Sequence, residues 1–371
     1  MQFAHLFQTC LFPRVEEEVG TLGAQARLLV QVLAMAPIAP WLQLGPGPGR
    51  PCEDRAALAT AFLAKAVFNC ATTRQLIEQL RTNTQLRRLC GWSGEQELPH
   101  ESTFSRAFAE FAQTELPQKL HEALIRSTQS HRLIGHISRD STAIEVRERF
   151  PEAAPAQPKP RGRKSRKQPR RAKPCERGTQ IERQRYKALP AMLAELPREC
   201  ALGVKTSSQG HSQCWRGFKL HTDVADGQIP ISLILTAANV HDAVVGIPLM
   251  TMSAERVTWL YDVMDSAYDA NAILEQSQKM GHVPIVKPHP RRNGRSQSVL
   301  PKIFQAKQAP EMTWAQQDRF QERTAVERVY ARLKDEFGAR QIRVRGPSKV
   351  MAHLMFGIVA LTVDQLLKLT G

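Results

Sequence analysis

The order of strand-like and helical stretches after residue 131 is the feature that most limits the folds open to this chain. Five stretches have the apolar, β-branched composition of strands, and they cover residues 132–146, 217–226, 230–239, 257–264 and 282–288. The hairpin-turn pair Asp226-Gly227 separates the second from the third. Helical patterns follow at about 241–253, 269–280, 317–338 and 348–369. Three strands, then alternating helix and strand, then helices predict a mixed α/β layered fold.

The region before residue 132 is predicted to be helical. A loose preamble of about 50 residues ends in the breaker cluster GPGPGRP. Four helical segments follow it: DRAALATAFLAKAVFNC, TTRQLIEQLRTNTQLRRLCGW, TFSRAFAEFAQ with Ser102 as its cap, and LPQKLHEALIRSTQ. A polar turn before a capped helix with Ser105 and Arg106 suits helix-turn-helix DNA binding, and a plain helical bundle fits as well. We therefore expect two parts, residues 1–131 and residues 132–371.

Positive charge is the strongest global property of the sequence. Fifty-one Lys and Arg face 35 Asp and Glu, which gives a formal charge of +16 and favours a polyanionic partner such as nucleic acid. Part of the excess lies in a predicted insertion at about 150–203, where Lys159 to Lys173 contains nine Lys and Arg and no acid. This segment is too polar to bury apolar surface, so we expect it to be disordered unless an anion orders it. Phosphate contact is favoured over a solvated tail for its cations Arg163, Lys164, Arg166, Lys167, Arg170 and Arg171.

Cysteine usage and the chain ends indicate a cytoplasmic protein. The cysteines are scattered and odd in number, without a CxxC pair, which predicts reduced thiols: Cys10, Cys52, Cys70, Cys90, Cys175, Cys200 and Cys214. The first 20 residues lack the basic start of a signal peptide. The apolar run VMAHLMFGIVALTVDQLLKL is long enough to cross a membrane, but it contains His353 and Asp364 and is expected to be a packed terminal helix.

A carboxylate occupies an unexpected place in the strand RDSTAIEV. Period-two alternation puts Asp140 on the same face as Thr142, Ile144 and Val146. An inward carboxylate is unfavourable unless a cation, a helix N-terminus or a metal ion compensates it. Asp140 is therefore a candidate functional residue.

A second carboxylate follows the apolar strand that precedes DSAYD. Asp265 stands at the end of that strand, where ligands collect in α/β sheets. Asp262 and Asp269 are close competitors, since Asp262 can point the other way within the strand and Asp269 can cap the next helix.

The segment RFQERTAVERVYARLKDEFG supplies a third carboxylate. An apolar stripe runs along the predicted helix through Val326, Val329, Tyr330, Leu333 and Phe337. Arg323, Glu327 and Lys334 form a line on the flank of that stripe, because offsets of four and seven residues return nearly to the same angle. Taken alone, such a line is usually an ion-pair ladder.

Together these motifs resemble the insertion-sequence transposases of the DDE class. Arg323-x3-Glu327-x6-Lys334 is similar to the family's Y-R-E-K signature, with Phe320 in place of the usual tyrosine. RDSTAIE resembles the first-aspartate strand, and DSAYD resembles the second-aspartate motif, which selects Asp265 over its competitors. WRGFKLHTDVADGQIPISLILTAANVHD resembles the stretch between them, and GRP followed by helices ending in LRRLCGW resembles the N-terminal region. The match spans most of residues 50–370.

The resemblance implies an RNase H-like mixed sheet flanked by helices, with a helical DNA-binding region before it. Asp140, Asp265 and Glu327 would be the catalytic residues and the ligands of two Mg²⁺ ions, which Mn²⁺ could replace. Arg323 and Lys334 would contact DNA phosphates. Arg340, Arg343 and Arg345 extend the basic track or are simply solvated.

The implied activity is transposition of the chain's own element. A transposase of this class would bind the terminal repeats, cleave there by Mg²⁺-dependent hydrolysis and join the 3′-OH to target DNA. The partners would be double-stranded DNA and a second copy of the chain, without a membrane, in the bacterial cytoplasm at the nucleoid. The alternatives are a metal-dependent nuclease without strand transfer and a catalytically silent DNA-binding protein derived from a transposase.

Overall fold

The catalytic half of the chain is built on a single mixed sheet. The computed structural model describes residues 6–42, 53–148, 178–206, 212–287 and 312–370. Its sheet has six strands in the order β2-β3-β1-β5-β6, with β4 also paired to β3. The strands are β1 (Leu133–Glu145), β2 (Ala201–Thr206), β3 (Ser212–Ala225), β4 (Ile229–Ala237), β5 (Thr258–Met264) and β6 (Val283–Val286). All five predicted strands are present, and the mixed α/β prediction is confirmed.

The register places the end of β5 beside the middle of β1. β1 is antiparallel to β3 and parallel to β5, with Arg139 opposite Met264. β3 and β4 form the expected hairpin, whose turn contains Gly227 and Gln228 at positive φ. Gly227 takes this conformation without the steric penalty that a Cβ atom brings.

The insertion predicted at about 150–203 is not a single irregular loop. Its described part contains α9 (Gln180–Gln184) and α10 (Leu189–Ala194), along the stretch IERQRYKALPAMLAELP whose pattern is helical, and the start of β2, which was not predicted. β2 pairs with the first residues of β3, so the two strands are neighbours in the chain as well as in the sheet. The basic residues 159–173 lie outside the described residues.

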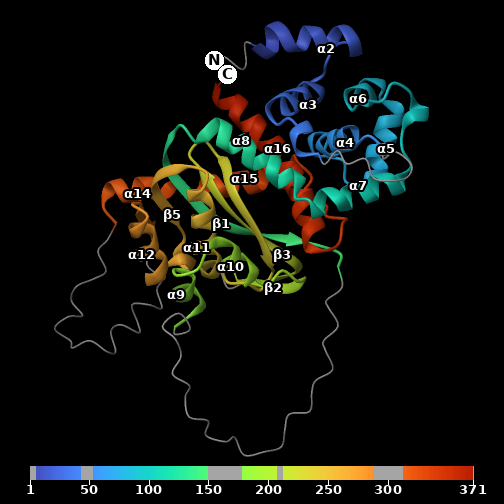
Figure 1. Ribbon diagram of the computed structural model, residues 1–371. Helices are drawn as coiled ribbons and strands as arrows, with labels where there is room; N and C mark the ends of the chain where they lie inside the picture. The colour runs from blue at the N-terminus through green and yellow to red at the C-terminus, as the bar shows by residue number, and fades with distance from the viewer. Residues whose placement is uncertain (1–5, 43–52, 149–177, 207–211, 288–311, 371) are drawn as a thin grey trace, which may run out of the picture.

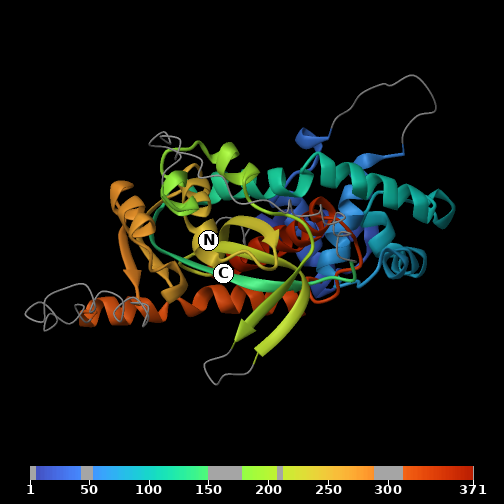
Figure 2. The same cartoon turned by 90° about the horizontal axis from the view of Figure 1, so that it is seen from below.

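Helices cover both faces of the sheet (Figures 1 and 2). Ser141 and Lys219 face α11 (Asp242–Ala254), where both contact Asp242. Thr142 faces the opposite side, where its hydroxyl accepts a hydrogen bond from Lys334 of α15 (Thr324–Asp335). The other helices of this half are α12 (Asn271–Lys279), α14 (Trp314–Gln321) and α16 (Pro347–Thr370). The RNase H-like arrangement of a mixed sheet between helices therefore emerges from alternating side-chain direction along β1.

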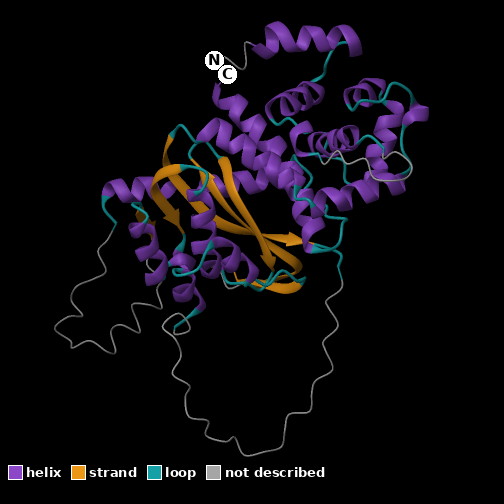
Figure 3. Ribbon diagram, viewed as in Figure 1, coloured by secondary structure: helices purple, strands orange, loops and turns teal. Residues whose placement is uncertain are grey.

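The N-terminal region is helical, as Figure 3 shows. Its helices are α2 (Phe12–Val19), α3 (Ala24–Met35), α4 (Arg55–Val67), α5 (Thr73–Thr82), α6 (Thr84–Leu89), α7 (Glu101–Gln113) and α8 (Leu116–Gln129). The expectation of a loose preamble was wrong for α2 and α3, because both are helices that bury apolar side chains. The predicted helix over 72–92 is broken at Asn83, which ends α5 and caps α6. The N-cap of α7 is His100, two residues before the expected Ser102.

Helix α16 joins the two halves of the molecule. It packs against α3, α4, α7 and α8 of the N-terminal region and against β4 and α15 of the other half. It is long and apolar enough to cross a membrane, but 72% of its most apolar window is buried inside the protein. The prediction of a packed terminal helix is confirmed. One continuous apolar core runs through both halves, and the division at residue 131 stays a prediction.

A buried ion cluster fixes the centre of the sheet. Arg139 is fully buried and donates to both carboxylate oxygens of Asp223, at 2.7 and 2.8 Å. Its guanidinium also lies 3.4 Å from Asp262 on β5. Ser253 donates to Asp223, and Trp259 and Ser277 donate to Asp262. The cluster therefore connects β1, β3 and β5 with all of its carboxylate oxygens bonded.

Replacing Arg139 should unfold the sheet more readily than any surface substitution. Arg139→Met leaves two carboxylates buried without their cation, which typically destabilises a protein by about 3–5 kcal/mol. Chemical denaturation monitored by circular dichroism measures this loss. Arg328→Met, at an exposed position of α15, is the control and should change stability by less than about 0.5 kcal/mol. A loss below about 1 kcal/mol for Arg139→Met would contradict the role given to the cluster.

Candidate active site

Asp140 lies near the middle of β1 on the face covered by α15. Its side chain is only 15% exposed and accepts a hydrogen bond from the backbone N–H of Ser141 at 2.7 Å. The hydroxyl of Tyr330 on α15 donates to the backbone carbonyl of Asp140 at 2.7 Å. Tyr330 thereby holds α15 against β1 at Asp140. The inward direction expected from alternation is confirmed.

Asp265 follows the last residue of β5, directly after the partner of Arg139. Because β1 and β5 are parallel, Asp265, just past the end of β5, comes level with Asp140 near the middle of β1. Its carboxylate accepts a hydrogen bond from the N–H of Ala267 at 2.8 Å and so begins a short 3-10 turn. Asp262, its main competitor, points into the buried ion cluster instead. The structure thus places these two carboxylates in different surroundings.

Glu327 lies in the first turn of α15 and is linked to Asp140 through Arg323. One guanidinium nitrogen of Arg323 is 3.0 Å from Glu327, and the other is 3.8 Å from Asp140. The side chain of Glu327 is 53% exposed, so it lies at the open rim of the site. The ion pair within the Arg323–Glu327 line is present, as its spacing predicts.

Lys334 lies two turns further along α15. Its Nζ donates to the hydroxyl of Thr142 at 2.8 Å, which keeps the ammonium over the same face of β1 as Asp140. Burial lowers the pKa of Lys334, and the neighbouring Arg340 and Lys205 add to this. Lys334 lies in positive surroundings, which an approaching phosphate would neutralise.

The carboxylates of the site repel one another. Burial, together with the charges of Asp265 and Asp242, raises the pKa of Asp140 to about 6, although the N–H of Ser141 acts in the opposite direction. Burial and the charge of Asp242 also raise the pKa of Asp265. The pKa of Asp242 itself is lowered, because His221, Lys219 and a hydrogen bond from Ser141 outweigh its burial. Asp242 is therefore already neutralised, while Asp140 and Asp265 share an excess of negative charge.

This excess suits a divalent cation between Asp140 and Asp265. Hard cations such as Mg²⁺ prefer carboxylate oxygens, and a nearby positive ion would remove the repulsion that raises both pKa values. Within the described ranges no three His, Cys, Asp or Glu side chains are grouped as a metal site. Glu327 is turned to Arg323, so it would have to leave that ion pair to become a third ligand.

Several other residues singled out in the sequence have structural roles. Trp215 is buried, and its indole N–H donates to the carbonyl of Phe218. His241 caps α11 by accepting from the N–H of Ala243. His221 is fully buried against Thr236. Asp242, the next residue of the NVHD motif, accepts hydrogen bonds from Ser141 and Lys219 beside the sheet. Arg163, Lys164, Arg166, Lys167, Arg170 and Arg171 lie outside the described residues.

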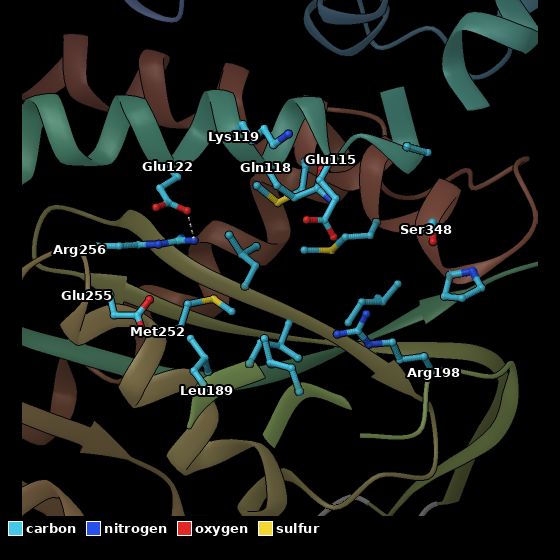
Figure 4. A pocket seen from close by; sticks show the side chains of 18 residues that line it. Glu115, Gln118, Lys119, Glu122, Leu189, Arg198, Met252, Glu255, Arg256 and Ser348 are labelled. Atoms are coloured by element: carbon cyan, nitrogen blue, oxygen red, sulfur yellow. Dashed lines mark hydrogen bonds and ion pairs between the residues drawn. The ribbon is translucent and has the colours of Figure 1, made fainter. Parts of the chain in front are cut away.

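A cavity of about 320 Å³ elsewhere in the molecule contains none of the three carboxylates. It lies among α8, α10, β4 and the ends of α11 and α16, as Figure 4 shows. Across it, Arg256 pairs with Glu122 at 3.1 Å and donates to the carbonyl of Ile231 at 2.8 Å. These contacts satisfy the charges of Arg256 and Glu122. The cavity is not the candidate active site.

The raised pKa of Asp140 predicts a conflict between stability and function. Its folded-state pKa of about 6 exceeds the ordinary value of 3.8 for an aspartate in the unfolded chain. The ionised form therefore opposes folding above this range, and the effect disappears as the pH falls through it. Asp140→Asn should therefore raise the stability at pH 7.5 by up to about 3 kcal/mol, and by much less at pH 4. Thermal denaturation across this pH range measures the difference.

Magnesium should reverse the order of the two proteins. Added Mg²⁺ should stabilise the wild type at pH 7.5 by binding only its folded state, and should stabilise Asp140→Asn much less. Equal stabilisation of both proteins by Mg²⁺, or an Asn variant that is less stable at pH 7.5, would rule out the charge repulsion described above.

Comparison with known proteins identifies the family of the chain. A family model described as "Transposase DDE domain" matches residues 135–363, and a second, "Transposase domain (DUF772)", matches residues 21–110. No curated protein matches the chain. The expected family and its RNase H-like fold are confirmed, while the Y-R-E-K subtype stays a prediction. The chain belongs to the insertion-sequence DDE transposases, which are metal-dependent enzymes acting on DNA.

Proposed function

We propose that the protein binds the terminal repeats of its own insertion sequence, cleaves the DNA there and transfers the resulting 3′-OH to target DNA. One observation carries this proposal. Asp140 on β1 and Asp265 just past the end of the parallel strand β5 lie level with each other, and Arg323 links Asp140 to Glu327 on the helix that crosses the same face. Three carboxylates on three elements of an RNase H-like sheet are the set that phosphoryl transfer on DNA needs.

Asp140, Asp265 and Glu327 are proposed as catalytic residues and as the ligands of two Mg²⁺ ions, which Mn²⁺ could replace. The ions would supply activation of the attacking oxygen and stabilisation of the leaving one. The raised pKa values of Asp140 and Asp265 support this assignment, since both carboxylates lack a sufficient positive charge nearby. Asp265 additionally keeps its orientation through the N–H of Ala267.

The basic residues of α15 are proposed to hold the DNA. Arg323 would exchange Glu327 for a phosphate near the cut, because its planar guanidinium can bind either anion with paired hydrogen bonds. Lys334 would act as a point charge on the transposon end. Arg163, Lys164, Arg166, Lys167, Arg170 and Arg171 are proposed as further phosphate contacts that do not depend on sequence.

The finer biology follows from the same proposal. The helical region 1–131 would recognise the terminal repeats, and a homodimer would bridge two ends in the bacterial cytoplasm at the nucleoid. A metal-dependent nuclease uses the same carboxylates but lacks strand transfer, so the products of the reaction separate the two activities. A silent DNA-binding protein is disfavoured because all three carboxylates are present.

Cleavage of the chain's own flanking DNA tests the proposal. Purified protein with Mg²⁺ should nick a duplex that contains the gene's flanks, and EDTA should stop it. Glu327→Gln keeps the size of the side chain but removes its charge, so it should lower the cleavage rate by at least about 100-fold. Gel analysis of end-labelled DNA gives both the nicks and the joined products.

Glu336→Gln is the matched control on the same helix. Glu336 is exposed and pairs with Arg332 on the side away from the carboxylates, so this variant should cleave at close to the wild-type rate. Nicking without joined products would favour the nuclease. Binding without cleavage in any divalent metal would favour the silent protein.

A further inference from the structure

A second pocket, of about 640 Å³, lies between the N-terminal helices and the segment that joins α15 to α16. Its wall consists of residues from α4, the start of α5, α7, residues 343–345 and the start of α16. Its charged side chains are Lys65, Arg74, Glu101, Arg343, Arg345 and Lys349. The N-terminal helices and the segment before α16 are far apart in sequence, and together they line a pocket with concentrated positive charge.

Lys65 is the unusual member of this group. It lies on α4, an otherwise apolar helix, and the residue is only 8% exposed. In the described part of the chain, no hydrogen bond or ion pair joins its ammonium group to another residue. Burial lowers its pKa to about 8. Burying a lysine without an anion is unfavourable, and an anion bound in the pocket would offset that cost.

The other charges of the pocket leave the same excess. Glu101 is the single acid of the lining, and it pairs with Arg74 at 3.0 Å. Arg343, Arg345 and Lys349 have no ion-pair partner among the residues that the structure describes. His353 also lines the pocket, but burial and the charge of Lys65 lower its pKa to about 3, so it is neutral. The pocket therefore presents four cations that no acid of its wall neutralises.

Its position makes the pocket a continuation of the candidate active site. Helix α15 carries Arg323 and Lys334 and leads from the carboxylates towards the segment with Arg343 and Arg345. Ile342 in that segment pairs with Val146, just beyond the end of β1. Both the strand of Asp140 and the helix of Glu327 thus end beside the pocket.

We propose that this pocket binds a backbone phosphate of duplex DNA that extends from the catalytic carboxylates along α15, with Lys65 as its buried ligand. The inference rests on the proposed function for the identity of the DNA. The hydroxyls of Thr72 and Thr73 at the start of α5, and of Ser105 on α7, line the same pocket and can donate to phosphate oxygens. The contact is to phosphate, so it strengthens binding without reading sequence.

The length of α15 sets where the phosphate lies. Its 12 residues extend for about 18 Å, so a duplex lying along it would reach the pocket within about one helical turn of the cut. Binding there would also tie the N-terminal helices to the catalytic half, since α4, α5 and α7 supply one wall and the start of α16 the other.

Binding of a fluorescent flank duplex by Lys65→Met tests the proposal. Methionine fills the same apolar path without the charge, so the melting temperature of the free protein should stay the same or rise. The affinity at about 150 mM salt should fall by about 3–10-fold, by the same factor on the flank and on an unrelated duplex. The slope of log K against log salt should become less negative by about 0.9, as expected for the loss of one phosphate contact.

Arg345→Gln, at an exposed position of the same pocket, gives a second variant whose folding is not at risk, and it should show the same loss of slope. Lys279→Met, at the exposed end of α12, is the control and should leave both affinity and slope unchanged. If Lys65→Met and Arg345→Gln both bind like the wild type with an unchanged slope, the pocket does not hold a phosphate.

Cleavage separates this inference from the proposed function. Lys65→Met should raise the DNA concentration needed for half-maximal cleavage and leave the rate at saturating DNA within about 2-fold. A protein that binds through Lys65 but never cleaves would overturn the proposed function alone. A protein that cleaves with Mg²⁺ while Lys65→Met leaves the half-maximal DNA concentration unchanged would overturn the phosphate pocket alone.

Discussion

The ion cluster of Arg139, Asp223 and Asp262 is the interaction on which the rest of the structure depends. It is fully buried and joins the three central strands β1, β3 and β5. Arg139 precedes Asp140 in the chain, and its strand partner Met264 precedes Asp265. The cluster lies on one face of the sheet and fixes the register of β1 against β5. The residues that follow, Asp140 and Asp265, belong to the candidate site on the other face. Burying charge in this way is stable only because hydroxyl and indole donors complete the bonding of both carboxylates.

The two faces of the sheet treat negative charge in opposite ways. On the side of α11, Asp223, Asp262 and Asp242 each have a cation in contact: Arg139 for the first two and Lys219 for the third. At the site itself, the one ion pair of Asp140 among the described residues is with a guanidinium nitrogen of Arg323, at 3.8 Å, and the pKa of Asp140 rises to about 6. The negative charge of Asp140 is thus compensated less completely than the charges of the other three buried acids. Such a difference favours Asp140 as the candidate functional carboxylate.

The C-terminal helix gives the protein its unity. Helix α16 contacts the N-terminal helices and the catalytic half along one buried length, and Arg332 of α15 is tied to Asp364 and Gln365 of α16. The phosphate pocket lies where α16 begins, so binding of DNA there and packing of the two halves depend on the same segment. A polyanion that enters this pocket would reinforce an arrangement that the apolar core already establishes.

The sequence by itself determined the elements and the three candidate carboxylates. Alternation along β1, the Asp226-Gly227 turn and the apolar stripe of α15 each report local physics, because side-chain direction repeats every 2 or 3.6 residues whatever the surroundings. Those patterns predicted five of the strands, the inward Asp140 and the Arg323–Glu327 pair, and the motifs predicted the family that the comparison shows.

Only the tertiary structure decided which charges are satisfied. Asp262 and Asp265 are three residues apart in one segment, yet one meets Arg139 and the other faces Asp140. Lys65 appears in the sequence as one lysine in an apolar helix, and its pocket exists only after Arg343, Arg345 and Lys349 arrive from the other end of the chain. The first two helices were missed for the same reason, since their apolar side chains pack against distant segments that include Leu89 and Leu367. Burial and ion pairing depend on distance in space, which local periodicity does not encode.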